Sequence, residues 1–182
     1  SEMGVLPVTE NQVGPPARNP WDLARSSGGS SGGSSAALAS GMLPLVHASD
    51  GGGSIRIPAS FCYRYGFKPS LSLLGNLHGK VNTLGLSVMG PISLTVEDAA
   101  AYLDVLSLRP PIGGSLGPCL QASRKRPEPL RIGLITEGTV GDVDPEFAAA
   151  ATRAAQLLEQ AGHTVVPLKP IQSSVADFEP MW

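Results

Sequence analysis

The sequence has few of the residues that bind metals or form disulfides, with two cysteines and three histidines among 182 residues. Two cysteines, Cys62 and Cys119, make neither a disulfide framework nor a zinc pattern, so we expect free thiols in a reducing compartment. The histidines lack the HxxxH spacing of a metal site; they are His47, His78 and His163. We therefore expect a cytoplasmic protein without a metal or another cofactor.

Charge and long apolar runs are also scarce. Charged residues make up 15% of the chain and the net charge is −2, which gives no long-range field to attract nucleic acid or acidic lipid. Gly, Pro or a charged residue interrupts every apolar run before the ~18–20 residues that a membrane helix needs. We expect neither a nucleic acid nor a membrane as a partner. The oligomeric state stays open, a homo-oligomer included.

Glycine and proline, in contrast, are abundant, at 22 and 17 residues, and regular structure is predicted between them. A short apolar run predicts a buried strand over 43–48. Thr95 with the acidic residues after it predicts an N-cap, and apolar residues recur at helical spacing over 95–108. The positions of this helix that we expect in the core are Val96, Ala100, Leu103 and Leu106. The Pro/Gly-rich segment 109–129 is expected to be a surface loop.

The remainder of the chain has the pattern of a strand, a helix and a second strand. The strands are predicted over 130–136 and 163–168. Asp144 and Pro145 open the helix between them, which runs to about Ala161 and ends at Gly162. This order is typical of a βαβ unit with parallel strands and a right-handed crossover. The expected fold class is α/β, with a mixed or parallel sheet flanked by helices.

Two Gly/Ser-rich segments allow more than one interpretation. Residues 25–35 read RSSGGSSGGSS, which by composition alone is a flexible linker. The helix-forming run at 36–39 favours instead a loop that offers free backbone N–H groups ahead of a helix, with Ser34 and Ser35 as its caps.

The second segment, residues 50–59, reads DGGGSIRIPA. Three consecutive glycines indicate a backbone that passes where side chains do not fit, so that a ligand touches main-chain amides or the chain makes a tight turn. An anion such as phosphate, bound there without chemistry, is a further alternative. A Ser-His-Asp triad of His47, Asp50 and Ser54 is a less favoured alternative. His47 and Asp50 are close together in the chain, but nothing in the sequence indicates that they face the serine.

Taken together, the two segments resemble the amidase signature family, with Ser54 standing 24 positions after Ser30. The resemblance covers nearly the whole chain, the predicted βαβ unit included. It extends through the segments NPWDL at 19–23, GFKP at 66–69, GPI at 90–92 and TVED at 95–98.

The resemblance implies a hydrolase of linear or cyclic amides that uses a Ser-cis-Ser-Lys triad and an acyl-enzyme. Ser54 would be the nucleophile and Ser30, after a cis peptide bond, the bridging serine. A serine needs such an activating base because its hydroxyl is a poor nucleophile. The oxyanion hole would consist of the backbone amides of Gly51, Gly52, Gly53 and Ser54. The expected partner is a small-molecule amide substrate.

Three residues are candidates for holding these loops rigid. Asp50 and Arg56 flank the glycine loop at positions that could pair, although an ordinary surface ion pair, worth ~0–1 kcal/mol, is the alternative. Ser31 is expected to form a hydrogen bond within its own loop.

The family's catalytic lysine stands upstream of the bridging serine, and no lysine precedes Ser30 in this sequence. We therefore expect residues 1–182 to be an internal fragment of a single amidase signature domain, inactive by itself. Its parts would be a signature core over 1–108, the loop 109–129 and the βαβ unit 130–182. An inactive remnant or binding module of the same fold is one alternative. The amidase-type component of a glutamyl-tRNA amidotransferase is a lesser one.

Overall fold

The computed structural model describes residues 4–71, 73–74, 86–107, 119–138 and 141–170. The chain divides into two compact units, Ser1–Lys125 and Arg126–Trp182, and each is described by itself. The elements of the first unit are β1 (Arg18–Asn19), β2 (Asp22–Ser26), α1 (Gly32–Ala39), β3 (Leu45–Asp50), α2 (Arg56–Phe61), β4 (Tyr65–Gly66), β5 (Val88–Ser93), α3 (Val96–Leu106) and α4 (Cys119–Ser123). Those of the second are β6 (Arg131–Leu134), α5 (Pro145–Gln160) and β7 (Thr164–Pro167).

The first unit is organised by a three-stranded antiparallel sheet in the order β3-β5-β4. Val46 pairs with Ile92 and Asp50 with Val88, so β3 and β5 run side by side over their whole length. β1 and β2 form a separate antiparallel pair. The predicted strand at 43–48 is thus present as β3, but its side chains alternate between buried and exposed instead of being buried throughout, because only one face of the strand packs into the core with α1 and α2.

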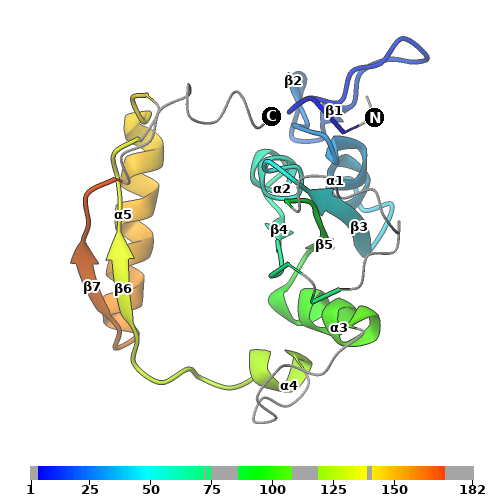
Figure 1. Cartoon of the computed structure of the whole chain (residues 1–182). Helices are drawn as coiled ribbons and strands as arrows, with labels where there is room; N and C mark the ends of the chain where they lie inside the picture. The colour runs from blue at the N-terminus through cyan, green and yellow to red at the C-terminus, as the bar shows by residue number, and fades with distance from the viewer. Residues whose placement is uncertain (1–3, 72, 75–85, 108–118, 139–140, 171–182) are drawn as a thin grey trace. The chain divides into compact units, whose positions relative to one another are not determined.

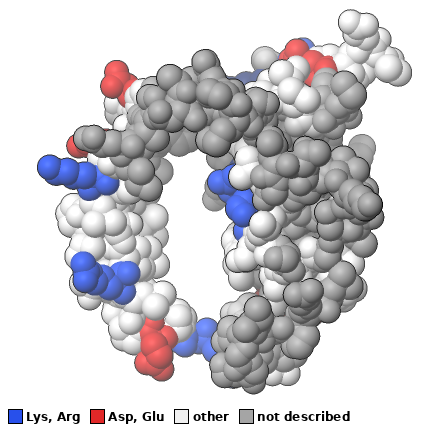
Figure 2. All heavy atoms as spheres, viewed as in Figure 1, with Lys and Arg blue, Asp and Glu red and all other residues white. Residues whose placement is uncertain are grey.

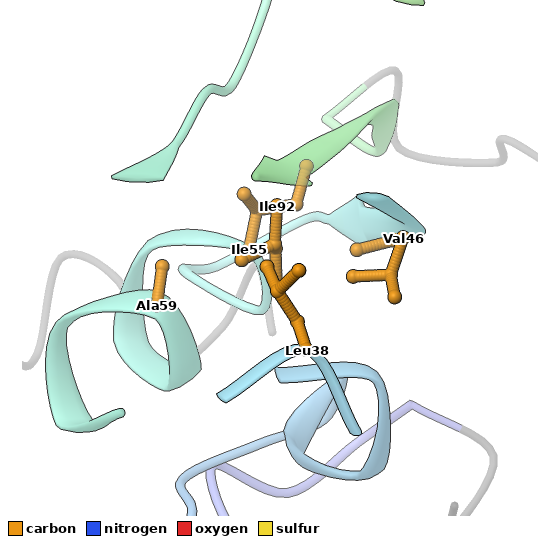
Figure 3. Packing of buried hydrophobic residues seen from close by; sticks show 6 residues of the cluster. Leu38, Val46, Ile55, Ala59 and Ile92 are labelled. Atoms are coloured by element: carbon orange, nitrogen blue, oxygen red, sulfur yellow. The ribbon is translucent and has the colours of Figure 1, made fainter. Parts of the chain in front are cut away.

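The core of the first unit lies between this sheet and the helices α1 and α2. Figure 3 shows Leu38 of α1, Val46 of β3 and Ile92 of β5 converging on Ile55, which directly precedes α2. Leu38, Ile55 and Ile92 are at most 1% exposed. At ~1.5–3 kcal/mol for each fully buried aliphatic side chain, this cluster fixes the two helices on the sheet.

The second unit is the βαβ unit that the sequence predicts. β6 and β7 are parallel, with Ile132 opposite Val165, and α5 lies along them (Figure 1). Asp144 caps α5 by accepting a hydrogen bond from the Glu146 amide at 2.8 Å, and Pro145 is its first residue. Gly162 follows the helix with φ +96°. Together with the first unit, these elements confirm the α/β fold class.

Helix α3 also forms as predicted, except in the face it buries. The Thr95 hydroxyl accepts from the Asp98 amide at 3.0 Å, the expected N-cap. Ala100 and Leu103 are buried, but Val96 is 50% exposed. Val96 is wrong as a core position: it shares a helix face with Ala100 and Leu103, but it is the first residue of α3, where that face is left uncovered. Leu106, the last residue of α3, is only partly buried.

A short helix, α4, lies in the segment expected to be a loop. The Asp104 carboxylate of α3 accepts hydrogen bonds from the amides of Cys119 and Leu120 at 2.5 and 2.9 Å. These are the first two residues of α4, so a side chain from the neighbouring helix α3 caps it. The Pro/Gly-rich part at 109–118 lies outside the described residues.

In the part of the chain that the structure describes, the surface shows no large region of one charge on the face drawn in Figure 2. On the face shown in Figure 2, the charged side chains stand in small separate groups of either sign. Among the described residues, no helix has the length and the apolar character needed to cross a membrane. Cys62, which is buried, and Cys119 are both free thiols.

Candidate active site

The serine-rich segment is a buried loop and not a flexible linker. Ser27 and Ser30 are 0% and 6% exposed, and the segment leads from β2 directly into α1. The Gly29–Ser30 peptide bond is cis, as the resemblance implies. Gly28 has φ +76°, a backbone conformation that favours glycine. Ser30 therefore occupies a defined place immediately before a helix.

The serines that follow Ser30 connect the loop to its neighbours in ways that differ from the expectation. The Ser31 hydroxyl donates to the Ser49 carbonyl of β3 at 3.4 Å, so it joins the loop to the sheet. Ser34 and Ser35 are wrong as caps, because α1 already begins at Gly32. Ser35 is instead fully buried, and its hydroxyl donates to the Pro58 carbonyl of α2 at 2.8 Å.

The glycine loop is held by the carboxylate of Asp50, whose side chain is 0% exposed. Arg56 donates to it through Nε and Nη2, both at 2.9 Å, in a bidentate ion pair. Backbone amides add to this pair, with Gly53 donating to Oδ1 at 2.7 Å and Ile55 to Oδ2 at 3.2 Å. Burial by itself raises the pKa of Asp50, but the guanidinium and these amides outweigh it, so the pKa lies below its ordinary value.

Ser54 lies inside this turn, half-buried, two residues before the first residue of α2. Gly53 precedes it with φ +130°. A Cβ at that position would lie 2.7 Å from Cδ1 of Ile57. The backbone conformation therefore favours glycine next to Ser54, and a side chain there would also have to displace the end of the Ile57 side chain.

The alternative Ser-His-Asp triad is not assembled. His47 and Asp50 are three residues apart on β3, so their side chains point to opposite faces of the strand. His47 is hydrogen-bonded through Nδ1 to the Tyr102 hydroxyl of α3, while Asp50 binds Arg56. Among the described residues, no three His, Cys, Asp or Glu side chains gather to hold a metal ion.

Sequence reasoning missed how the NPWDL segment anchors the site. The Asn19 side-chain amide donates to the Phe61 carbonyl at 2.7 Å, and the Trp21 indole donates to the Cys62 carbonyl at 2.8 Å. The Arg64 guanidinium lies 5.3 Å from the Trp21 ring centroid. These contacts satisfy carbonyls at the end of α2 and fix the start of β2. The only sequence signal for them was the motif itself.

The site consists of two Gly/Ser-rich loops, one directly before α1 and one directly before α2, beside the three-stranded sheet. This arrangement is the class of site to which the comparisons with known proteins apply. The sequence profile of the Amidase family matches residues 1–178. The chain therefore belongs to the amidase signature family. Its relatives in this family include amide hydrolases.

The 6-aminohexanoate-cyclic-dimer hydrolase of Pseudomonas sp. strain NK87 is 41% identical over 174 residues, which are 90% of this chain and 35% of the relative. A glutamyl-tRNA(Gln) amidotransferase component of Sulfurihydrogenibium sp. strain YO3AOP1 is 39% identical over 86% of this chain and 33% of the relative. A solved bacterial aryl acylamidase of the amidase signature family matches with a TM-score of 0.86 and 32% identity, over 97% of this chain and 38% of that one. The chain thus spans about a third of the length of these relatives.

Proposed function

We propose that this chain carries the nucleophile of an amidase that hydrolyses linear or cyclic carboxamides. The observation that best supports the proposal is the buried Asp50 carboxylate, which pairs with Arg56 and binds the amides around Ser54. A turn with so many fixed bonds holds the backbone at Ser54 in one place, which supports the precise placement that a nucleophile requires. Membership of the amidase signature family supports the same assignment.

In the proposed reaction, the Ser54 hydroxyl oxygen attacks the carbonyl carbon of the amide. Its proton passes through Ser30 to a neutral lysine that lies upstream of Ser30 in the family. The carbonyl oxygen takes up the negative charge of the tetrahedral intermediate. The C–N bond then breaks, the leaving amine or ammonia takes the proton, and water hydrolyses the acyl-enzyme at Ser54.

The oxyanion of that intermediate is received by the backbone amides of the glycine loop, at Gly51, Gly52, Gly53 and Ser54. The Gly53 amide already donates to Asp50, so it contributes least of the four. Losing one such donor typically costs ~10²–10³ in rate. Asp50, Arg56 and Ser31 are positioning residues in this scheme, because their contacts go to backbone and to each other.

The test is covalent labelling by a fluorophosphonate of the protein as its natural gene encodes it, followed by peptide mapping. We expect the label on Ser54 in the wild type and none in Ser54→Ala. Ser60→Ala is the matched control, because Ser60 is an exposed serine of α2, and it should label normally. A folded wild type that is not labelled and releases no amine from any amide tested would contradict the proposal that the protein is an amidase. It would favour a binding module or an inactive remnant of the same fold.

The amidase-type component of a glutamyl-tRNA(Gln) amidotransferase is the second candidate, because such a protein is nearly as identical to this chain as the cyclic-dimer hydrolase is. The DGGGSIRIP version of the glycine loop favours the hydrolase. Comparing turnover of a cyclic amide with that of glutamine separates the two. Simple anion binding at the glycine loops predicts that sulfate raises the melting temperature, which the amidase proposal does not require.

A further inference from the structure

The segment Gly4–Thr9 runs along the loop that holds Ser30, although no sequence motif assigns it a role. At Gly4, a Cβ would lie 3.7 Å from the Ser30 hydroxyl oxygen. At Gly29, a Cβ would lie 2.5 Å from the backbone nitrogen and oxygen of Val8. The backbone at Val8 therefore lies against the backbone at Gly29, and Gly4 lies near the Ser30 side chain.

Thr9 is the residue of this segment that bonds to the loop through its side chain. It is 8% exposed. Its hydroxyl donates to the Gly28 carbonyl at 3.0 Å, with the Ser30 carbonyl a longer alternative acceptor at 3.4 Å. The same oxygen accepts from the Gly32 amide at 3.2 Å. One hydroxyl thus ties together the residues on both sides of Ser30.

The Gly32 amide explains why this contact matters. Gly32 is the first residue of α1, and an N–H in that position has no partner within the helix. Ser31, the N-cap residue, forms no side-chain capping bond, and its hydroxyl is directed to β3 instead. Thr9 supplies the missing acceptor from 23 residues away. The Thr9 backbone is itself anchored, since its carbonyl accepts from the Ala17 amide at 2.9 Å.

We propose that Thr9 is a positioning residue for the amidase reaction, one whose hydroxyl fixes the backbone on either side of Ser30 and with it the place from which Ser30 relays the proton of Ser54. This inference rests on the proposed function. Thr9 does not touch the reacting atoms in this scheme. It acts by holding the backbone on either side of Ser30, and a misplacement of about 1 Å there can lower a rate by about 10²-fold.

The experiment compares Thr9→Val, which keeps the shape and loses the hydroxyl, with Thr9→Ser, which keeps the hydroxyl. The probe is a fluorophosphonate, and both kinact and KI are measured on the protein as its gene encodes it. We expect Thr9→Val to lower kinact by about 10- to 100-fold with little change in KI. Thr9→Ser should stay close to the wild type. Thr152→Val, a change of an exposed threonine on α5, is the matched control and should change neither constant.

Amide hydrogen exchange at Gly32, followed by NMR, provides a readout that needs no activity. The wild type and Thr9→Ser should protect this amide, and Thr9→Val should expose it. A Gly32 amide that exchanges in the wild type as fast as in an unstructured peptide overturns the inference, even if Thr9→Val fails to fold. So does a folded Thr9→Val with wild-type kinact, or a Thr9→Ser as impaired as Thr9→Val. An inert wild type instead refutes the proposed function, and the role of Thr9 in the reaction is refuted with it.

Discussion

Replacing Asp50 by asparagine removes the charge that the glycine loop is built around. Breaking a buried ion pair by removing one partner costs about 3–5 kcal/mol. Arg56, however, is 55% exposed and regains water when its partner is lost. The asparagine side chain also keeps one acceptor oxygen, but its NH2 group replaces the other. That NH2 group would face backbone amides or the Arg56 guanidinium, which are donors themselves. We therefore expect Asp50→Asn to lower the free energy of unfolding of the first unit by about 2–3 kcal/mol.

The assay is urea unfolding followed by the fluorescence of Trp21, which lies in the same unit, in a background where every other tryptophan of the protein is replaced by phenylalanine. The midpoint should fall while the slope with urea stays constant, because the surface exposed on unfolding does not change. Glu97→Gln is the control. It breaks the ion pair between Glu97 and Arg124, in which both side chains are more than half exposed, and should cost less than about 1 kcal/mol. If Asp50→Asn lowers the free energy of unfolding by no more than Glu97→Gln does, the argument that the Asp50 carboxylate organises the loop is refuted.

The stability difference between the wild type and Asp50→Asn should also depend on pH, in a direction that the pKa of Asp50 determines. The pKa of Asp50 is lower in the folded protein than its ordinary value. Its contribution is therefore fully present above the unfolded pKa of about 3.9 and is lost as the pH falls through the lower folded pKa. The stability difference between the wild type and Asp50→Asn should accordingly shrink below about pH 4. A difference that grows on acidification would contradict this assignment.

Three further predictions concern single residues of the first unit. Gly53→Ala should lower the free energy of unfolding by about 1–3 kcal/mol, because Gly53 has φ +130° and a Cβ there would contact Ile57. Gly33→Ala is the control and should not destabilise the unit, because a Cβ there meets open space. Urea unfolding measures both. Thr95→Ala removes the N-cap of α3 and should cost about 1 kcal/mol, seen as a lower thermal midpoint; an unchanged midpoint would contradict the capping bond. Burial raises the pKa of Tyr102 to about 12, so a phenolate titration of Tyr102→Phe at 295 nm should lack the step near pH 12 that the wild type shows.

Local signals accounted for much of the architecture. The caps at Thr95 and Asp144, and the glycine after α5, were readable because each acts within one helical turn. Helix α4 was not readable, because Asp104 caps it from another helix. The exposure of Val96 was missed for a similar reason. Periodicity gives the apolar stripe of a helix, but the edge of the neighbouring sheet decides how much of the stripe is covered.

By itself, the sequence determined the α/β class, the βαβ unit and the two Gly/Ser-rich loops, since these depend on periodicity, caps and the absence of side chains. Only the tertiary structure decided what surrounds those loops. It placed Asp50 at 0% exposure with Arg56 and the loop amides bound to it, and it turned His47 to the opposite face of β3. It also brought Thr9 onto the backbone on both sides of Ser30. Such contacts join residues far apart in the chain, and they form only when packing brings their segments together.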